Sequence, residues 1–203
     1  MIDNKKVIEI LRNISNKINE QKDYLTQLDN EIGDGDHGVN LARGFTEVDK
    51  KLDTLTDKDI GTILKAVGMT LVSSVGGASG PLYGTAFMYA GKQVSDKFEI
   101  DINDFKEIIK VAIEGVQVRG KAVRGEKTML DSMIPALEAM NEENDSKACL
   151  NKAIDAANKG IEYTKTIIAT KGRASYLGER SLGHQDPGAT SFTYLLEAIS
   201  EKL

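Results

Sequence analysis

The sequence predicts an all-α domain built from eight amphipathic helices. Apolar residues recur every three, four or seven positions along most of the 203 residues, which is the spacing of one helix face. No segment alternates polar and apolar residues as a strand would, and no repeat or low-complexity linker divides the chain. Most connections are short, so consecutive helices should pack as antiparallel neighbours. We therefore expect one domain over residues 1–203.

The first half of the chain predicts four helices. Val7, Leu11, Ile14, Ile18 and Leu25 share one helix face and define the first. Pro81 suits the first position of the fourth, where its missing N–H costs nothing. The expected ranges are about 4–27, 37–52, 60–71 and 81–97.

The second half predicts four more. Asn103 can cap the fifth, and a polar break follows from 119 to 127. Thr128-x-x-Asp131 resembles a capping box for the sixth, in which Pro135 marks either a kink or the true start. Asp186-Pro187 reads as the cap and first residue of the eighth. The seventh is expected near 149–168, before a long loop at 170–185.

Composition narrows the function classes. The net charge of −5 leaves no basic face for nucleic acid. A single cysteine, Cys149, excludes an internal disulfide and, with no signal-peptide core at the N-terminus, predicts a cytoplasmic protein. Residues 66–91 carry no charge and are long enough to span a bilayer, but the glycines at 76–80 interrupt them. Two buried helices meeting at a loop explain this stretch better than a membrane span.

The loop between the first two helices holds the strongest chemical signal. Residues 28–40 contain four acids, one of two histidines and three glycines. Two unit charges about 5 Å apart repel by roughly 3 kcal/mol at an effective dielectric of 20, so converging carboxylates need a cation or a proton. Asp29, Asp34 and Asp36 are hard oxygen donors, which favours Mg²⁺ holding phosphates. The alternative is a solvated turn rich in Asp and Gly.

Other motifs fit this loop poorly. Gly33-x-Gly35-x-x-Gly38 matches a dinucleotide fingerprint, but a helix precedes it where a strand is required. A calcium loop starting at Asp34 would need Gly and Glu where Val39 and Phe45 stand. Neither a Walker-type phosphate loop nor a Gly-x-Ser-x-Gly elbow occurs.

Two further glycine-rich loops are candidate anion sites. Residues 76–81 precede a helix whose N-terminal amides could bind a phosphate, although a tight turn between buried helices is the favoured explanation for this loop taken alone. Residues 172–188 are too long and polar for a mere connector. Arg173 there is a candidate phosphate contact or a solvated surface charge. Met129 could form an apolar wall for a base or belong to the core.

Three blocks together resemble a known family. They are Asp29-x-x-x-x-Asp34-Gly-Asp36-His-Gly-x-Asn40, Gly-Gly-Ala-Ser-Gly-Pro at 76–81, and Gly-His-Gln-Asp-Pro-Gly-Ala-Thr-Ser at 183–191. They strongly resemble the nucleotide-binding L subunits of dihydroxyacetone kinases, nearly end to end. The resemblance implies a closed barrel of eight antiparallel helices, with nucleotide on the loops at one end. It also implies that Asp29, Asp34 and Asp36 bind two Mg²⁺. The implied nucleotide contacts are His37, Gly38, Val39, Asn40, Ala78, Ser79, Gly120, Met129, Arg173, Asp186, Pro187 and Gly188.

The resemblance also implies a reaction. Because the helical domain fills the chain, it is similar to the free-standing subunit of the phosphoenolpyruvate-dependent enzyme. In that family ADP is a bound coenzyme, which a phosphohistidine donor subunit (M) converts to ATP. The phosphoryl group then passes to dihydroxyacetone on a K subunit. We find no general base, so transfer would be metal-assisted.

Two alternatives remain at this stage. One is the ATP-binding domain of a fatty acid kinase-like enzyme, which carries further domains. The other is a regulatory nucleotide-binding relative that does not transfer phosphate. The sequence leaves both a monomer and a homodimer open.

Overall fold

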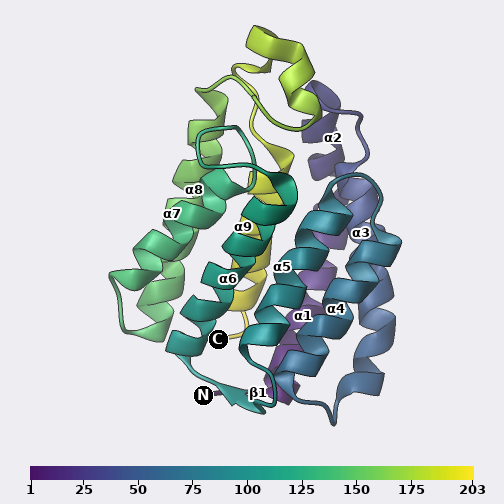
Figure 1. Cartoon of the computed structure of the whole chain (residues 1–203), viewed down its shortest axis with the longest axis vertical. Coiled ribbons are helices and arrows are strands. Elements are labelled where there is room, and N and C mark those ends of the chain that lie inside the picture. The colour runs from purple at the N-terminus through teal and green to yellow at the C-terminus, as the bar shows by residue number, and fades with distance from the viewer.

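The computed structural model describes residues 1–203 as a bundle of nine α-helices and two short 3₁₀ helices (Figure 1). A two-stranded antiparallel sheet pairs β1 (Ile2–Asp3) with β2 (Glu99–Ile100). The helices are α1 (Asn4–Glu20), α2 (Lys22–Ile32), α3 (His37–Leu52), η1 (Asp53–Leu55), α4 (Ile60–Ser74), α5 (Ser79–Gln93), α6 (Ile102–Gly120), α7 (Leu130–Asn141), α8 (Ser146–Lys165), η2 (Arg173–Ser181) and α9 (Pro187–Ser200).

The first predicted helix is two helices. The chain leaves helical geometry at Gln21, where ψ is 5°, and α2 then continues to Ile32. No glycine or proline marks this break, and Ile18 and Leu25 are both fully buried on either side of it. The prediction of eight α-helices therefore misses one division. Because α2 continues past the predicted helix end at 27, Asp29 lies in the last turn of a helix and not in the loop that follows.

Several predicted helix ends move by a few residues. Helix α5 begins at Ser79, two residues before Pro81, and ends at Gln93. Helix α6 is capped by Asp101, whose carboxylate accepts from the N–H groups of Asn103 and Asp104, so Asn103 is not the cap. The small sheet and η2 were not predicted. Both are too short to leave a periodic signal in the sequence.

One further predicted cap forms as expected, and a second forms only in part. Asp186 caps α9 by accepting from the N–H of Ala189 at 2.7 Å, and Pro187 is the first residue of the helix. The capping box predicted at Thr128 forms only in part: Asp131 accepts from the N–H of Thr128 at 2.9 Å, but the residue that caps α7 is Met129, which makes no side-chain cap bond. Pro135 lies inside α7 and neither begins nor ends that helix.

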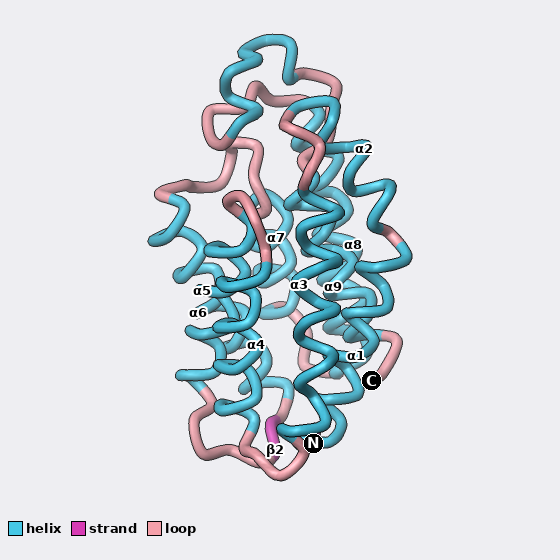
Figure 2. Tube along the Cα trace, turned by 90° about the vertical axis from the view of Figure 1, so that its right-hand side faces the viewer, coloured by secondary structure: helices cyan, strands magenta, loops and turns pink.

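The helices pack around one apolar core. Helix α1 lies between α3 and α9, and further neighbouring pairs are α3–α4, α4–α5, α5–α6, α6–α7, α7–α8 and α8–α9. The two views agree on this arrangement, with α4, α5 and α6 on one side and α1, α8 and α9 on the other (Figure 2). Phe45 and Leu11 are among the largest side chains in the shared core. No helix combines the length and apolarity needed to cross a bilayer.

Close contact between α4 and α5 explains the uncharged stretch from 66 to 91. A Cβ atom on Gly68 would lie 2.7 Å from the carbonyl oxygen of Gly84, and one on Gly84 would lie 2.8 Å from the carbonyl oxygen of Gly68. Any larger residue would push the two backbones apart. The stretch is therefore a tightly packed helix pair.

Alternate connections gather at one end of the bundle. The α2–α3, α4–α5 and α6–α7 loops and the long α8–α9 segment lie at the top of Figure 1, whereas both termini and the sheet lie at the bottom. Each of the three sequence blocks singled out above thus contributes to the same end.

Candidate functional site

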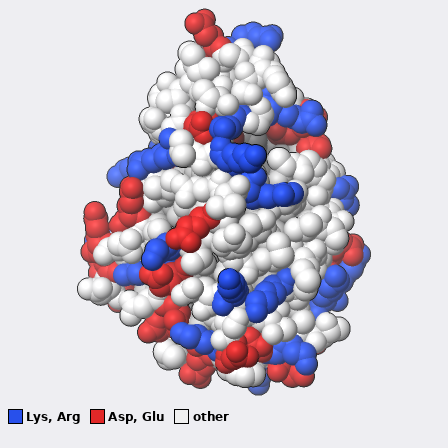
Figure 3. All heavy atoms as spheres, in the orientation of Figure 1, with Lys and Arg blue, Asp and Glu red and all other residues white.

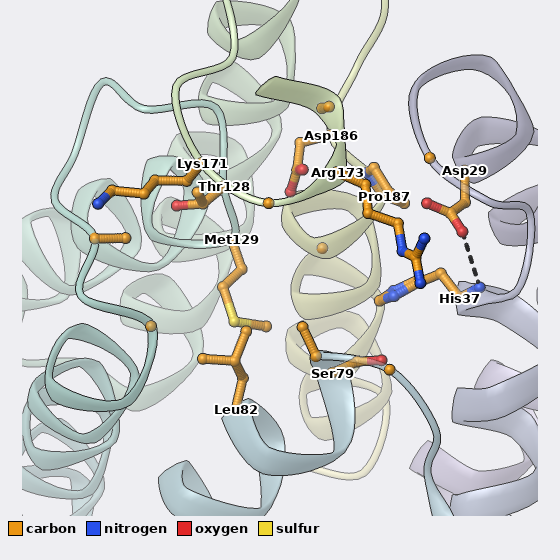
Figure 4. Close-up of a pocket in the computed structure, with 18 of the residues that line it drawn as sticks. Asp29, His37, Ser79, Leu82, Thr128, Met129, Lys171, Arg173, Asp186 and Pro187 are labelled. Atoms are coloured by element: carbon orange, nitrogen blue, oxygen red, sulfur yellow. Dashed lines mark hydrogen bonds between the residues drawn. The ribbon is translucent and has the colours of Figure 1, made fainter. Parts of the chain in front are cut away.

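A pocket of about 510 Å³ opens between these loops (Figure 4). Its volume is in the usual range for a small-molecule or cofactor site. Most of the predicted site residues line it, namely Asp29, Asp34, Asp36, His37, Ala78, Ser79, Gly120, Met129, Arg173, Asp186, Pro187 and Gly188. The structure therefore brings together segments that are up to about 160 residues apart in the sequence.

Three carboxylates converge on one side of the pocket. One oxygen from each of Asp29, Asp34 and Asp36 lies within 4.8 Å of the other two. Asp29 Oδ2 also accepts hydrogen bonds from the backbone N–H groups of Asp36 at 2.9 Å and His37 at 3.1 Å. The loop is thereby folded back over the end of α2, which places the two later acids beside the first.

Two glycines allow the chain to fold back over the end of α2. Gly35 has a φ of +72°, a conformation that other residues adopt only with strain. Gly38 packs against α2 so closely that a Cβ atom would lie 2.0 Å from the carbonyl oxygen of Lys22. The positions of both glycines are therefore set by the backbone path between α2 and α3.

Arg173 supplies positive charge to the acidic cluster. Its Nη2 lies 2.9 Å from Asp34 Oδ2, and the Arg173 side chain is 64% exposed. An exposed ion pair of this kind is weak and exchangeable. The three carboxylates alone form a donor set of hard oxygen atoms that fits a divalent cation such as Mg²⁺, which would compete with Arg173 for Asp34.

His37 is held by a chain of buried hydroxyl groups. Its Nε2 lies 3.0 Å from Ser191 Oγ on α9, and Ser191 Oγ lies 2.7 Å from the hydroxyl of Tyr83 on α5. Enclosure by the protein lowers the pKa of His37, although Asp29 and Asp36 act in the opposite direction. Three helices are thus joined by hydrogen bonds beside the pocket, which only His37 of these residues lines.

Two helix N-termini border the pocket. Ser79 begins α5, and Pro187 and Gly188 form the first turn of α9. Figure 4 shows Asp186 pointing into the pocket from the wall opposite Ser79. Burial raises the pKa of Asp186 to about 7. Free N–H groups at such termini favour anionic ligands.

The side of the pocket away from the carboxylates combines apolar side chains with the polar Thr128 and Lys171 (Figure 4). Met129 and Leu82 extend toward each other there (Figure 4). Gly120, at the end of α6, lets Leu82 approach, since a Cβ atom on Gly120 would lie 3.2 Å from Leu82 Cδ2. Met129 is 96% buried, so it belongs to the core as well as to the pocket wall. The pocket thus has an acidic end and an opposite end, called the apolar end below, where Met129 and Leu82 supply apolar surface.

Three predicted contact residues do not line the pocket. Gly38, Val39 and Asn40 form the first turn of α3 behind the acidic loop. The side chain of Val39 faces solvent, and Asn40 is buried and accepts a hydrogen bond from Arg43 at 2.7 Å. These three residues could therefore contact a ligand only with the backbone atoms of the first turn of α3.

The sequence does not predict that Lys127 is buried. Lys127 is 99% buried, and its ammonium group donates to the carbonyl oxygens of Thr164, Ile167 and His184. It joins the loop before α7, the end of α8 and the turn before α9, and burial lowers its pKa. Nothing in a lone lysine within a polar loop marks it as buried. Further lining residues that were not predicted include Leu82, Arg119, Thr128 and Lys171.

Similar proteins fall into one group. The DAK2 domain family matches residues 31–201. The ADP-binding subunit DhaL of the PEP-dependent dihydroxyacetone kinase of Escherichia coli (strain K12) is 46% identical over 89% of this chain and 88% of its own length. The ADP-binding subunit DhaL of the PTS-dependent dihydroxyacetone kinase of Lactococcus lactis subsp. lactis (strain IL1403) is also 46% identical, over 96% of this chain and 95% of its own length.

A solved structure agrees with this grouping. The crystal structure of the dihydroxyacetone kinase from C. freundii in complex with AMP-PNP and Mg²⁺ matches 98% of this chain with a TM-score of 0.77 and 26% identity. This chain corresponds to only 34% of that larger protein. The fold and the three sequence blocks therefore agree, and the chain belongs to the family of ADP-binding L subunits of dihydroxyacetone kinase, whose shared unit is the DAK2 domain.

Proposed function

We propose that this chain is the phosphoryl-transfer subunit of a phosphoenolpyruvate-dependent dihydroxyacetone kinase. It holds a nucleotide as a coenzyme: a phosphohistidine donor subunit (M) converts the bound ADP to ATP. The γ-phosphoryl group then passes to dihydroxyacetone on a K subunit. The observation that carries this proposal is the convergence of three carboxylates on a nucleotide-sized pocket in a chain of this family.

The acidic end of the pocket suits the phosphates. Asp29, Asp34 and Asp36 would hold two Mg²⁺, which when bound neutralise charge that spreads over the phosphate oxygens. Arg173 lies beside this cluster and can turn from Asp34 to a phosphate oxygen, because its ion pair is exposed. Phosphoryl transfer needs such positioning and charge neutralisation more than covalent chemistry by the protein.

The rest of the pocket suits a nucleoside. Met129, Leu82 and Gly120 would enclose the base at the apolar end. Ala78 and Ser79 at the start of α5, and the turn formed by Asp186, Pro187 and Gly188, would contact the sugar and phosphates between the two ends. His37, Gly38, Val39 and Asn40 would add contacts from the start of α3, the last three through the backbone.

The architecture fits this role. We propose that the helix neighbours close into one eight-membered barrel, in which α2 extends α1 beyond the ring, and that residues 1–203 act as one domain. The ring order α1, α3, α4, α5, α6, α7, α8, α9 supports closure, since α9 packs against α1. The open end of the pocket would face the partner subunits in turn, in the cytoplasm.

The division of labour predicts what the isolated chain does. In the proposed reaction dihydroxyacetone is held by the K subunit, so the pocket of this chain binds the nucleotide and not the ketose hydroxyl. We expect the acceptor to be activated on the K subunit. The chain alone should therefore bind nucleotide and form no glycerone phosphate.

One reconstitution tests the proposal. The purified chain is mixed with phosphorylated M subunit, K subunit and dihydroxyacetone, and glycerone phosphate is measured. Product should form only with all three proteins. D34N and D36N should abolish ADP retention through gel filtration, whereas D57N, which changes an exposed acid near the opposite end, should not. Full retention of ADP in both pocket variants would refute the metal assignment, and nucleotide binding without turnover would refute the transfer role.

A further inference from the structure

The Ser191 hydroxyl lies at the meeting point of three hydrogen bonds. Ser191 is fully buried in α9, and its Oγ lies 3.1 Å from the carbonyl oxygen of Gly188, 2.7 Å from Tyr83 Oη and 3.0 Å from His37 Nε2. Tyr83 is 97% buried as well. No part of the nucleotide site proposed above requires this serine, so the arrangement needs its own explanation.

The protons in this cluster can be placed by counting. A hydroxyl group has one hydrogen to donate and two lone pairs that accept. The Gly188 carbonyl can only accept, so all three contacts can be hydrogen bonds at once only if the single Ser191 hydrogen points to this carbonyl. Ser191 must then accept from both remaining partners: the Tyr83 hydroxyl donates to Ser191, and His37 donates through an Nε2–H.

This proton placement fixes the other ring nitrogen of His37. In a neutral imidazole with hydrogen on Nε2, Nδ1 is an acceptor. Nδ1 forms no hydrogen bond with the chain, and the ring lines the pocket (Figure 4). His37 therefore presents a lone pair, not an N–H, to whatever enters beside the carboxylates.

We propose that Ser191 is a positioning residue that holds His37 in the Nε2–H tautomer, so that Nδ1 accepts a hydrogen bond from a metal-bound water. Phosphate oxygens are acceptors and would repel the Nδ1 lone pair. Hydrated Mg²⁺ keeps several waters, whose hydrogens are donors. The ring would thereby favour the magnesium complex of a nucleotide over the free nucleotide. The preference for the magnesium complex rests on the proposed function, whereas the assignment of the His37 tautomer does not.

The tautomer is measured first, without any ligand. Two-bond ¹H–¹⁵N spectra at pH 8 distinguish the neutral tautomers, and the chain has only two histidines, so H184Q assigns the signals. We expect Nε2–H for His37 in the unaltered protein and in Y83F, since Ser191 still donates to Gly188 in that variant. We expect S191A to lose this preference. S132A is the matched control, because Ser132 is an equally buried serine that donates to Ala157 on α8.

Two spectral results would overturn the first part. One is an Nδ1–H tautomer of His37 in the unaltered protein, a result that needs no variant to fold. The other is an unchanged Nε2–H preference in S191A.

The ligand preference is measured next by calorimetry. The ratio of ADP dissociation constants in EDTA and in Mg²⁺ is compared between proteins. An Nδ1–H exposed in S191A can donate to a phosphate oxygen, so this ratio should fall by roughly fivefold to tenfold, the effect of one hydrogen bond. S132A should keep the original ratio, which separates this effect from general loss of packing.

The outcomes are distinguishable. An unchanged ratio in S191A, with an altered tautomer, would refute the role of Nδ1 toward magnesium-bound water. Failure of the unaltered protein to bind ADP at all would refute the proposed function. The ligand-free spectra would still decide whether Ser191 sets the tautomer.

Discussion

Asp29 and Asp36 are joined by a hydrogen bond that crosses the loop between α2 and α3. Asp29 Oδ2 accepts from the Asp36 N–H at 2.9 Å, and the same oxygen accepts from the next N–H along the chain. Asp34 instead pairs with the exposed Arg173 side chain. Asp29 and Asp34 belong to one cluster, but Asp29 holds the backbone of the loop and Asp34 only forms an exposed ion pair.

We expect D29A to destabilise the metal-free protein and D34A to leave its stability nearly unchanged. D29A leaves two backbone N–H groups without their acceptor, which should lower the free energy of unfolding by about 1–3 kcal/mol. D34A removes only an exposed ion pair, worth about 0–1 kcal/mol. Urea denaturation in EDTA measures both. Equal losses would contradict the structural role assigned to Asp29.

Gly38 and Gly120 should respond differently to alanine. In G38A the added Cβ meets the Lys22 backbone carbonyl at 2.0 Å, so α2 and α3 must separate, and we expect a loss of roughly 2–4 kcal/mol in stability. In G120A the Cβ meets only the flexible end of Leu82 at 3.2 Å. We expect native stability there and weaker ADP binding. Thermal unfolding and calorimetry separate the two effects, and a strongly destabilised G120A would contradict this account.

Lys127 should stabilise the loops that surround the pocket. K127M removes the donor shared by three carbonyl oxygens, which we expect to cost about 2–4 kcal/mol of unfolding free energy. ADP should also dissociate faster, since the loops before α7 and α9 lose their common attachment. K147M, at an exposed position of α8, is the control. A K127M protein as stable as K147M would show that the carbonyl contacts contribute little.

Asp186 should make stability depend on pH. Burial raises its pKa to about 7 in the folded protein, compared with about 4 when unfolded. The folded state therefore binds this proton more tightly, and its stabilising effect is lost as pH rises from about 4 through 7. D186N keeps a good N-cap but cannot ionise. Relative to D186N, the unaltered protein should lose on the order of a few kcal/mol between pH 5 and 8 in EDTA. Parallel pH profiles of the two proteins would contradict the assignment.

Much of the fold could be predicted because the helices are amphipathic and well capped. The stripe through Leu11 and Ile18, and the cap at Asp186, are local signals that tertiary packing leaves in place. The division at Gln21 could not be predicted, since neither glycine nor proline marks it and the buried spacing from Ile18 to Leu25 continues across it. A bend of this kind is set by what the helix packs against.

The site was predictable where its residues are unusual for a loop. Asp34 and Asp36 are conspicuous because closely spaced acids with no lysine or arginine beside them in the sequence repel one another, and the pocket brings them together with Asp29. Lys127 and Ser191 were missed as site residues for the opposite reason. Each is an ordinary polar residue in sequence, and its role follows only from burial and from partners on other helices.

The hydrogen bonds to Asp29 also bear on ion selectivity. Oδ2 already accepts two N–H groups, so Oδ1 is the oxygen of Asp29 left for a cation. A carboxylate engaged in this way binds a metal through one atom and not two. Calcium sites commonly use bidentate carboxylates and six to eight ligands, whereas the smaller magnesium ion takes six in a strict octahedron. We therefore expect the α2–α3 loop to discriminate against calcium through its backbone, without any side chain dedicated to that purpose.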